Sequence, residues 1–159
     1  MKRPWNRTNS SIYSLLTHNV KDEINMNICT YVSVVNMNPR QYIISIDYNT
    51  LTYKNLISSK SNLVLQCLGQ KNINTIRSLG NKSGLFFNKI SYFKKNQLTT
   101  NWNNFTVLKD VAFLVELKEP KKIFEMNDHA LFLFSVESFK NLKNKILTFN
   151  DLIEKKIIL

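Results

Sequence analysis

The sequence NMNICTYVSVVNMNPRQYIISIDYNTLT, from Asn25 to Thr52, decides the fold of this 159-residue chain. Residues 25–35 predict a strand with small or apolar side chains on both faces, which is typical of a strand covered on both sides. Asn38-Pro39-Arg40 predicts a turn, and residues 41–47 predict a second strand. The stretch is therefore expected to form a hairpin that leads directly into the start of a helix.

Mainly strands are predicted on both sides of this hairpin. Further strands are expected at residues 11–18, 62–68, 110–118, 122–126 and 130–139. Two helices are expected, one capped by Thr50 or Thr52 and one over residues 70–79 that ends at Gly80. A turn is predicted at residues 119–121, between the third and the fourth of these strands.

The remaining segments complete the expected architecture. Residues 81–89 predict a loop, residues 90–104 are polar and rich in Asn, and residues 147–159 are expected to pack back onto the domain. Short strands at close spacing favour a closed barrel over a doubly wound parallel sheet. The expected fold class is therefore mainly β with short helices, an α+β β-barrel, with residues 1–159 as a single domain.

The composition limits the classes of function. The formal net charge is +11, which favours anionic ligands, although scattered lysines are also typical of an ordinary solvated surface. Cys29 and Cys67 lie in apolar runs and predict reduced, buried thiols and a cytoplasmic protein. No apolar run is long enough to cross a membrane, and no secretory signal is recognised.

Several common catalytic and nucleotide-binding motifs are absent from the sequence. The three glycines form no dinucleotide-binding fingerprint, and there is no phosphate-binding P-loop or nucleophile elbow. His and Cys residues lack the spacing of a zinc site, so no metal is expected. Asp128 and His129 are expected to point apart on a strand and to form no acid–base pair.

Hydroxyl and amide groups are the chemistry that remains, around the end of the hairpin. A helix N-terminus has free N–H groups and a partial positive charge, and it can bind a phosphate. Thr50 and Thr52 could add hydroxyl donors at this position, or they could simply cap the helix. The residues alone leave both interpretations open.

Five pieces of the chain resemble the flavin reductase-like family, the FMN-binding split-barrel proteins. They occur in the family's order and span most of the chain. The pieces are residues 2–7 (KRPWNR), 25–33 (NMNICTYVS), 45–52 (SIDYNTLT), 79–84 (LGNKSG) and 127–133 (NDHALFL). Two positions depart from the family pattern: Asn127 replaces the usual Gly before Asp-His, and residues 85–89 are more apolar than the usual acidic loop.

This resemblance implies a homodimer that binds FMN, with FAD as the alternative, near the dimer interface. Residues 27–33 would line the flavin ring, residues 45–52 would hold the ribityl chain and phosphate, and Ser83 and Lys89 would belong to a covering loop. His129 would lie beside the flavin or nicotinamide ring. The implied cofactor-binding residues are Asn27, Ile28, Cys29, Thr30, Tyr31, Ser33, Ser45, Ile46, Asp47, Asn49, Thr50, Thr52, Ser83 and Lys89.

The function implied by the resemblance is an NAD(P)H-dependent flavin reductase, an oxidoreductase that transfers hydride to flavin N5. The cofactor would carry the redox chemistry, and the protein would supply binding, orientation and electrostatics. A partner monooxygenase or another electron acceptor would use the reduced flavin. Two alternatives are a flavin-binding carrier or sensor without reductase activity, and a basic barrel that binds single-stranded nucleic acid.

Overall fold

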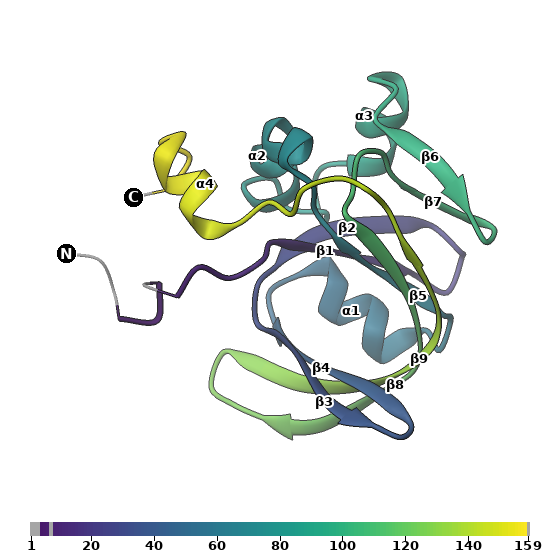
Figure 1. Cartoon of the computed structure of the whole chain (residues 1–159). Helices are drawn as coiled ribbons and strands as arrows, with labels where there is room; N and C mark the ends of the chain where they lie inside the picture. Colours follow the sequence, from purple (N-terminus) through teal and green to yellow (C-terminus); the bar gives the residue numbers. More distant parts are fainter. Residues whose placement is uncertain (1–3, 7, 159) are drawn as a thin grey trace.

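A seven-stranded antiparallel sheet forms the centre of the structure, a computed structural model that describes residues 4–6 and 8–158 (Figure 1). The strand order is β2-β1-β5-β8-β9-β4-β3. The strands are β1 (Tyr13–His18), β2 (Ile24–Cys29), β3 (Val32–Met37), β4 (Arg40–Asp47), β5 (Leu63–Cys67), β8 (Phe113–Glu125) and β9 (His129–Asn141). The predicted mainly β class is confirmed, whereas Lys2, Arg3 and Arg7 of the first matching piece lie outside the described residues.

The two edges of this sheet are joined by only two residues. β2 and β3 lie at opposite edges, yet only Thr30 and Tyr31 separate them in the chain. Because each extended residue spans at most about 3.5 Å, the edges must approach within roughly 10 Å there. The sheet therefore curls into a barrel that is split at Thr30–Tyr31, where the Ser45 N–H donates to the Tyr31 carbonyl at 3.0 Å. The prediction of a single strand over residues 25–35 is wrong, because within this stretch the chain passes from one edge of the sheet to the other.

Short helices and a second, two-stranded sheet complete the fold. A short 3₁₀ turn, η1 (Pro4–Asn6), precedes β1. The others are α1 (Leu51–Ser58), the 3₁₀ helix η2 (Gln70–Thr75), α2 (Ile76–Gly80), α3 (Lys89–Lys95), β6 (Thr99–Trp102), β7 (Phe105–Leu108) and α4 (Phe149–Glu154). Helix α3 and the β6–β7 hairpin were not predicted from the polar sequence of residues 90–104. The hairpin turns through Asn103 and Asn104, whose positive φ angles of 44° and 58° are typical of a tight two-residue turn.

Strand β8 is longer than predicted. The turn expected at residues 119–121 is wrong, because β8 pairs with β9 from Phe113 to Glu125. A register shift between Lys118 and Lys121 accommodates Pro120, and Glu119 has a φ of 55°. Bulges of this kind let a strand contain a residue that cannot donate to the ladder.

Both faces of β1 and β5 are buried. Leu15 and Leu65 belong to the cluster inside the barrel, which also contains Leu56 of α1. Leu16 and Val64 face the other way, into a second cluster that α2, α3 and α4 cover (Figure 1).

Among the described residues, no helix is long and apolar enough to cross a membrane.

Candidate functional site

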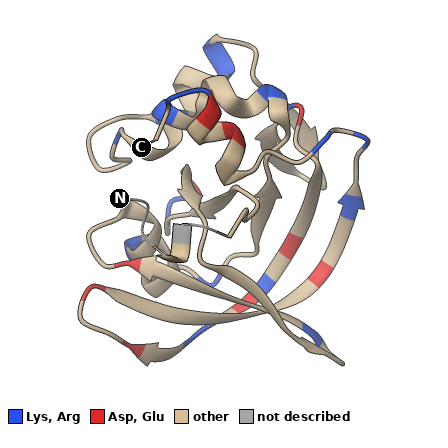
Figure 2. Cartoon of the chain, turned by 60° about the vertical axis from the view of Figure 1, so that its left-hand side comes forward, with Lys and Arg blue, Asp and Glu red and all other residues tan. Residues whose placement is uncertain are grey.

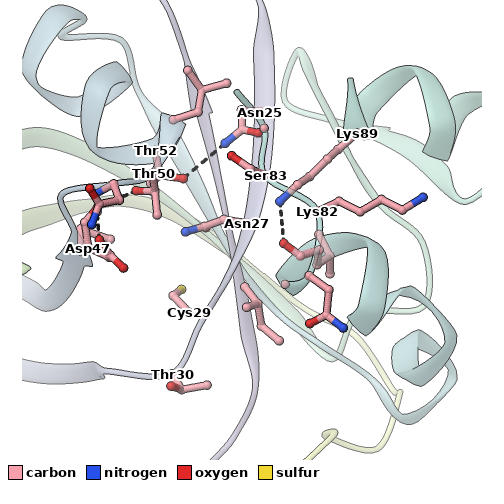
Figure 3. A pocket seen from close by; sticks show the side chains of 18 of the residues that line it. Asn25, Asn27, Cys29, Thr30, Asp47, Thr50, Thr52, Lys82, Ser83 and Lys89 are labelled. Carbon is pink, nitrogen blue, oxygen red and sulfur yellow. Dashed lines mark hydrogen bonds between the residues drawn. The ribbon is translucent and has the colours of Figure 1, made fainter. Parts of the chain in front are cut away.

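A cavity of about 390 Å³ lies where the barrel is split, within the size range of small-molecule sites (Figure 3). Four parts of the chain line it: the end of β2 with Thr30 and Tyr31, the end of β4 with the start of α1, the segment from Leu79 to Lys89, and His129. Their meeting point follows from the topology, because the break at Thr30 brings the end of β2 beside the end of β4.

The residues predicted as a flavin site come together here, with one exception. Of the fourteen implied cofactor residues, all but Ser33 line the cavity, and His129 lines it too. Ser33 is exposed on β3, and its hydroxyl donates only to the carbonyl of its neighbour Val34. The sequence reasoning missed Asn25, Leu51, Leu79, Gly80, Asn81, Lys82 and Gly84. All seven lie within the pieces that carry the resemblance, so the matching segments, more than single polar positions, indicated the site.

The N-terminus of α1 forms one wall of the cavity. The Thr50 hydroxyl accepts from the Tyr53 N–H at 3.1 Å and donates to the Asp47 carbonyl at 2.7 Å, so the predicted helix cap is confirmed. The Asn49 N–H donates to the Asp47 carboxylate at 2.8 Å. In the described part of the chain, the N–H groups of Leu51 and Thr52 donate to no protein acceptor. This wall therefore presents free backbone donors and the positive end of a helix dipole.

Lys89 on the opposite wall carries a buried ammonium group. It is the first residue of α3, it is only 4% exposed, and its Nζ donates to the Leu79 carbonyl at the end of α2 (Figure 3). Burial lowers the pKa of Lys89 to about 8. Among residues 4–6 and 8–158, no carboxylate pairs with it. A buried cation without a counter-charge is costly, and an anionic ligand would stabilise it.

Two glycines allow the chain to pack closely around the cavity. A Cβ on Gly84 would lie 2.3 Å from Asn25 Oδ1, and Asn25 Nδ2 in turn donates to Thr52 Oγ1 at 3.3 Å. A Cβ on Gly80 would lie 3.2 Å from Ile28 Cγ2. Helix α2 ends at Gly80 as predicted, but with an ordinary negative φ, so the small residue serves close packing rather than a left-handed cap.

His129 forms a hydrogen bond with Asp128, contrary to the prediction that the two side chains point apart. His129 Nδ1 and Asp128 Oδ1 are 2.8 Å apart, and the hydrogen bond from His129 lowers the pKa of Asp128. The alternation of side chains along a strand does not apply to this pair, because β9 begins at His129 and Asp128 lies in the preceding turn. Since a carboxylate can only accept, the pair places a proton on Nδ1 and leaves Nε2 free in the neutral ring. Tyr31, 60% exposed, packs edge-on against this ring at 5.9 Å.

The cysteines are free and buried, as predicted. Burial raises the pKa of both thiols, that of Cys67 to about 12, so both stay protonated and unreactive at neutral pH. Cys29 is thus a small apolar part of the cavity wall. The described residues contain no cluster that could hold a metal ion.

Lysines and arginines are scattered over separate strands, helices and loops of the chain (Figure 2). They form no continuous stripe in this view, whereas a protein that follows a nucleic-acid backbone needs a basic groove. The buried Lys89 on the cavity wall is therefore a more specific indication of anion binding than the overall charge is.

Comparison with known proteins gives matches among solved structures alone. No family model and no curated protein matches the chain. The NADH:FAD oxidoreductase SgcE6 of Streptomyces globisporus superposes with a TM-score of 0.77 at 11% identity, covering 92% of this chain and 85% of that one. The styrene monooxygenase flavin reductase of Pseudomonas putida S12 gives 0.76 at 11% identity, covering 94% and 91%.

Two other solved structures have a similar fold. The FMN-binding protein of Thermus thermophilus gives a TM-score of 0.72 at 15% identity, with coverage of 89% of this chain and 75% of that one. The chain spans about half, 51%, of a matched structure from Sinorhizobium meliloti. At these identities the likeness concerns the fold. The chain therefore has the fold of the flavin reductase-like family, the split barrel of flavin reductases and FMN-binding proteins.

Proposed function

We propose that this chain binds a flavin in the cavity at the barrel split and acts as an NAD(P)H-dependent flavin reductase. The observation that carries this function is the buried ammonium of Lys89, which has no carboxylate partner among the described residues, on the wall of a cavity whose other wall presents free N–H groups. Both features suit a ligand with a phosphate group. The names of the similar structures, which are flavin reductases and FMN-binding proteins, support the choice of a flavin.

The chain's own groups fit the parts of such a ligand. The N–H groups of Leu51 and Thr52 would hold the phosphate, with the charge of Lys89 nearby. Asp47 lines the cavity between this helix and the barrel, where its carboxylate can accept hydrogen bonds from ribityl hydroxyls. Residues 27–31 would line the ring, because all five of them line the cavity at the end of β2.

A bound flavin would supply the hydride-accepting chemistry, and the protein would supply position and shielding. Tyr31 and His129 form an aromatic wall of the cavity, where a nicotinamide ring could approach the flavin. Asp128 fixes the His129 ring with Nε2 free, so this nitrogen can hold or accept a proton at the site. The buried Cys29 thiol takes no part because its pKa is raised.

Anaerobic titration tests this function. Protein loaded with FMN or FAD is expected to lose its visible flavin absorbance when NADH or NADPH is added. Flavin binding without this bleaching by either nucleotide would support the carrier or sensor alternative instead. Failure of riboflavin, FMN and FAD to bind at all would contradict the proposed site.

We also propose that the chain forms a homodimer through an apolar groove on β3, β4, β8 and β9. Met37, Phe139 and Val34 line this groove and are 71%, 55% and 51% exposed. Such a face is more typical of an interface than of a monomer surface. Light scattering is expected to give twice the chain mass of 18.6 kDa, and Met37→Asp is expected to shift the protein towards the monomer. A monomeric wild-type protein would contradict the dimer.

A further inference from the structure

A second cavity of about 500 Å³ lies beside the flavin cavity. Four residues line both cavities: Asn25, Leu51, Gly84 and Lys89. The two cavities therefore adjoin each other. They meet where Gly84 lies close to Asn25 and Leu51, next to the N-terminus of α1 and the Lys89 side chain. A ligand whose phosphate lies between α1 and Lys89 is at the border of the second cavity.

The second cavity combines three kinds of group that suit an adenosine. Phe86 on its rim is 91% exposed. Phe87, in contrast, packs against Tyr92 and lies under the Lys82 ammonium at 4.2 Å. In the described part of the chain Phe86 has no aromatic or cationic partner, so its ring is free to stack on a planar base. Base stacking on an aromatic side chain is worth about 1–3 kcal/mol.

Charged side chains add the other two kinds of group. Asp22 and Glu23 lie on the wall formed by the β1–β2 turn, and Asp22 accepts no hydrogen bond from residues 4–6 or 8–158. Carboxylates at such a position can accept hydrogen bonds from the two hydroxyls of a ribose. Lys89 and Lys94 bring positive charge to the same cavity, which suits a pyrophosphate.

We propose that the second cavity binds the adenosine diphosphate half of a flavin dinucleotide, so that the preferred cofactor is FAD rather than FMN. This assignment rests on the proposed flavin binding in the first cavity. The pyrophosphate lies at the shared border beside Lys89, the ribose faces Asp22, and the adenine stacks on Phe86.

Binding titrations with riboflavin, FMN and FAD test this inference, with flavin fluorescence as the readout. FAD is expected to bind about tenfold more tightly than FMN, because of the added base stacking. Phe86→Ala is expected to weaken FAD binding about tenfold and to leave FMN binding unchanged, whereas Phe86→Tyr keeps the ring and retains the affinity. ADP is expected to compete with FAD but not with riboflavin.

A matched control is Phe124→Ala, which removes an exposed ring, 61% exposed, outside both cavities. It is expected to leave all three affinities unchanged. Equal affinities for FMN and FAD, or equal effects of Phe86→Ala on both, would overturn the adenosine site while flavin binding stands. An effect of Phe86→Ala on the KM for NADH alone would also overturn it, by assigning the cavity to the nicotinamide nucleotide. Loss of every flavin would instead count against the proposed function.

Discussion

Replacement of Lys89 by Met weakens FMN binding by about 10- to 100-fold, while riboflavin binding changes little. This expectation follows from the loss of a charge-assisted contact, worth about 1.5–3 kcal/mol, between a buried ammonium and a phosphate that riboflavin lacks. Met is chosen because it fills much of the same volume without the charge. Fluorescence titration of the two ligands against the wild-type and variant proteins measures the effect.

The same substitution is expected to stabilise the ligand-free protein. The pKa of Lys89 is lowered to about 8 in the folded state, below the ordinary Lys value, so the unfolded chain binds more protons between the two values. The free energy of unfolding of the wild type therefore rises with pH from about 8 to about 10.5. Lys89→Met removes this slope. Denaturant unfolding of the ligand-free proteins across that pH range measures it.

Lys95→Met provides the matched control, because Lys95 is on the same helix α3 but exposed and outside both cavities. It is expected to change neither the FMN affinity nor the pH slope. An equal loss of FMN and riboflavin affinity in Lys89→Met would place the ammonium beside the ring instead of the phosphate. Unchanged affinity for both ligands would show that Lys89 serves only the contact with the Leu79 carbonyl.

Local chemistry explains which parts of the site could be predicted. The Thr50 cap depends on residues within one helical turn, so the sequence alone indicates it. The strands of the hairpin depend on the alternation of side chains over a few residues, so the sequence also predicts that this region forms strands. The break at Thr30 was not predicted, because both halves of residues 25–35 have the pattern of a strand. They are separate strands only because β2 pairs with β1 and β3 pairs with β4, at opposite edges of the sheet.

Long-range contacts explain what the sequence could not indicate. Resemblance placed Lys89 at the site, but its burial depends on the Leu79 carbonyl and on how α3 packs. The second cavity lies between the β1–β2 turn, α1 and α3, and α3 itself was not predicted. The hydrogen bond between Asp128 and His129 depends on where β9 begins, and sequence patterns locate strand ends least well.

Gly84→Ala is expected to lower both the stability and the flavin affinity. The new Cβ would lie 2.3 Å from Asn25 Oδ1 and 3.2 Å from Leu51 Cδ2, so either the loop must move or Asn25 must leave Thr52. Overpacking of this kind costs about 1–3 kcal/mol, which corresponds to a fall in Tm of roughly 2–10 °C. Thermal unfolding and FMN titration of the variant measure the two effects.

Gly80→Ala is the control for stability. Its Cβ would meet only Ile28, with Cγ2 at 3.2 Å, which is a much milder contact than the one at Gly84, and Ala is favoured over Gly in a helix by about 1 kcal/mol. A smaller fall in Tm than for Gly84→Ala is therefore expected. The clash itself is tested by Asn25→Ala, which removes the Oδ1 atom that Gly84→Ala would strike. If the clash is the cause, Gly84→Ala costs much less stability in the Asn25→Ala background than in the wild type. If the losses of stability caused by Gly84→Ala and Asn25→Ala are additive in the double variant, Gly84 is required for another reason. The Asn25 contact would then not position the loop between the two cavities.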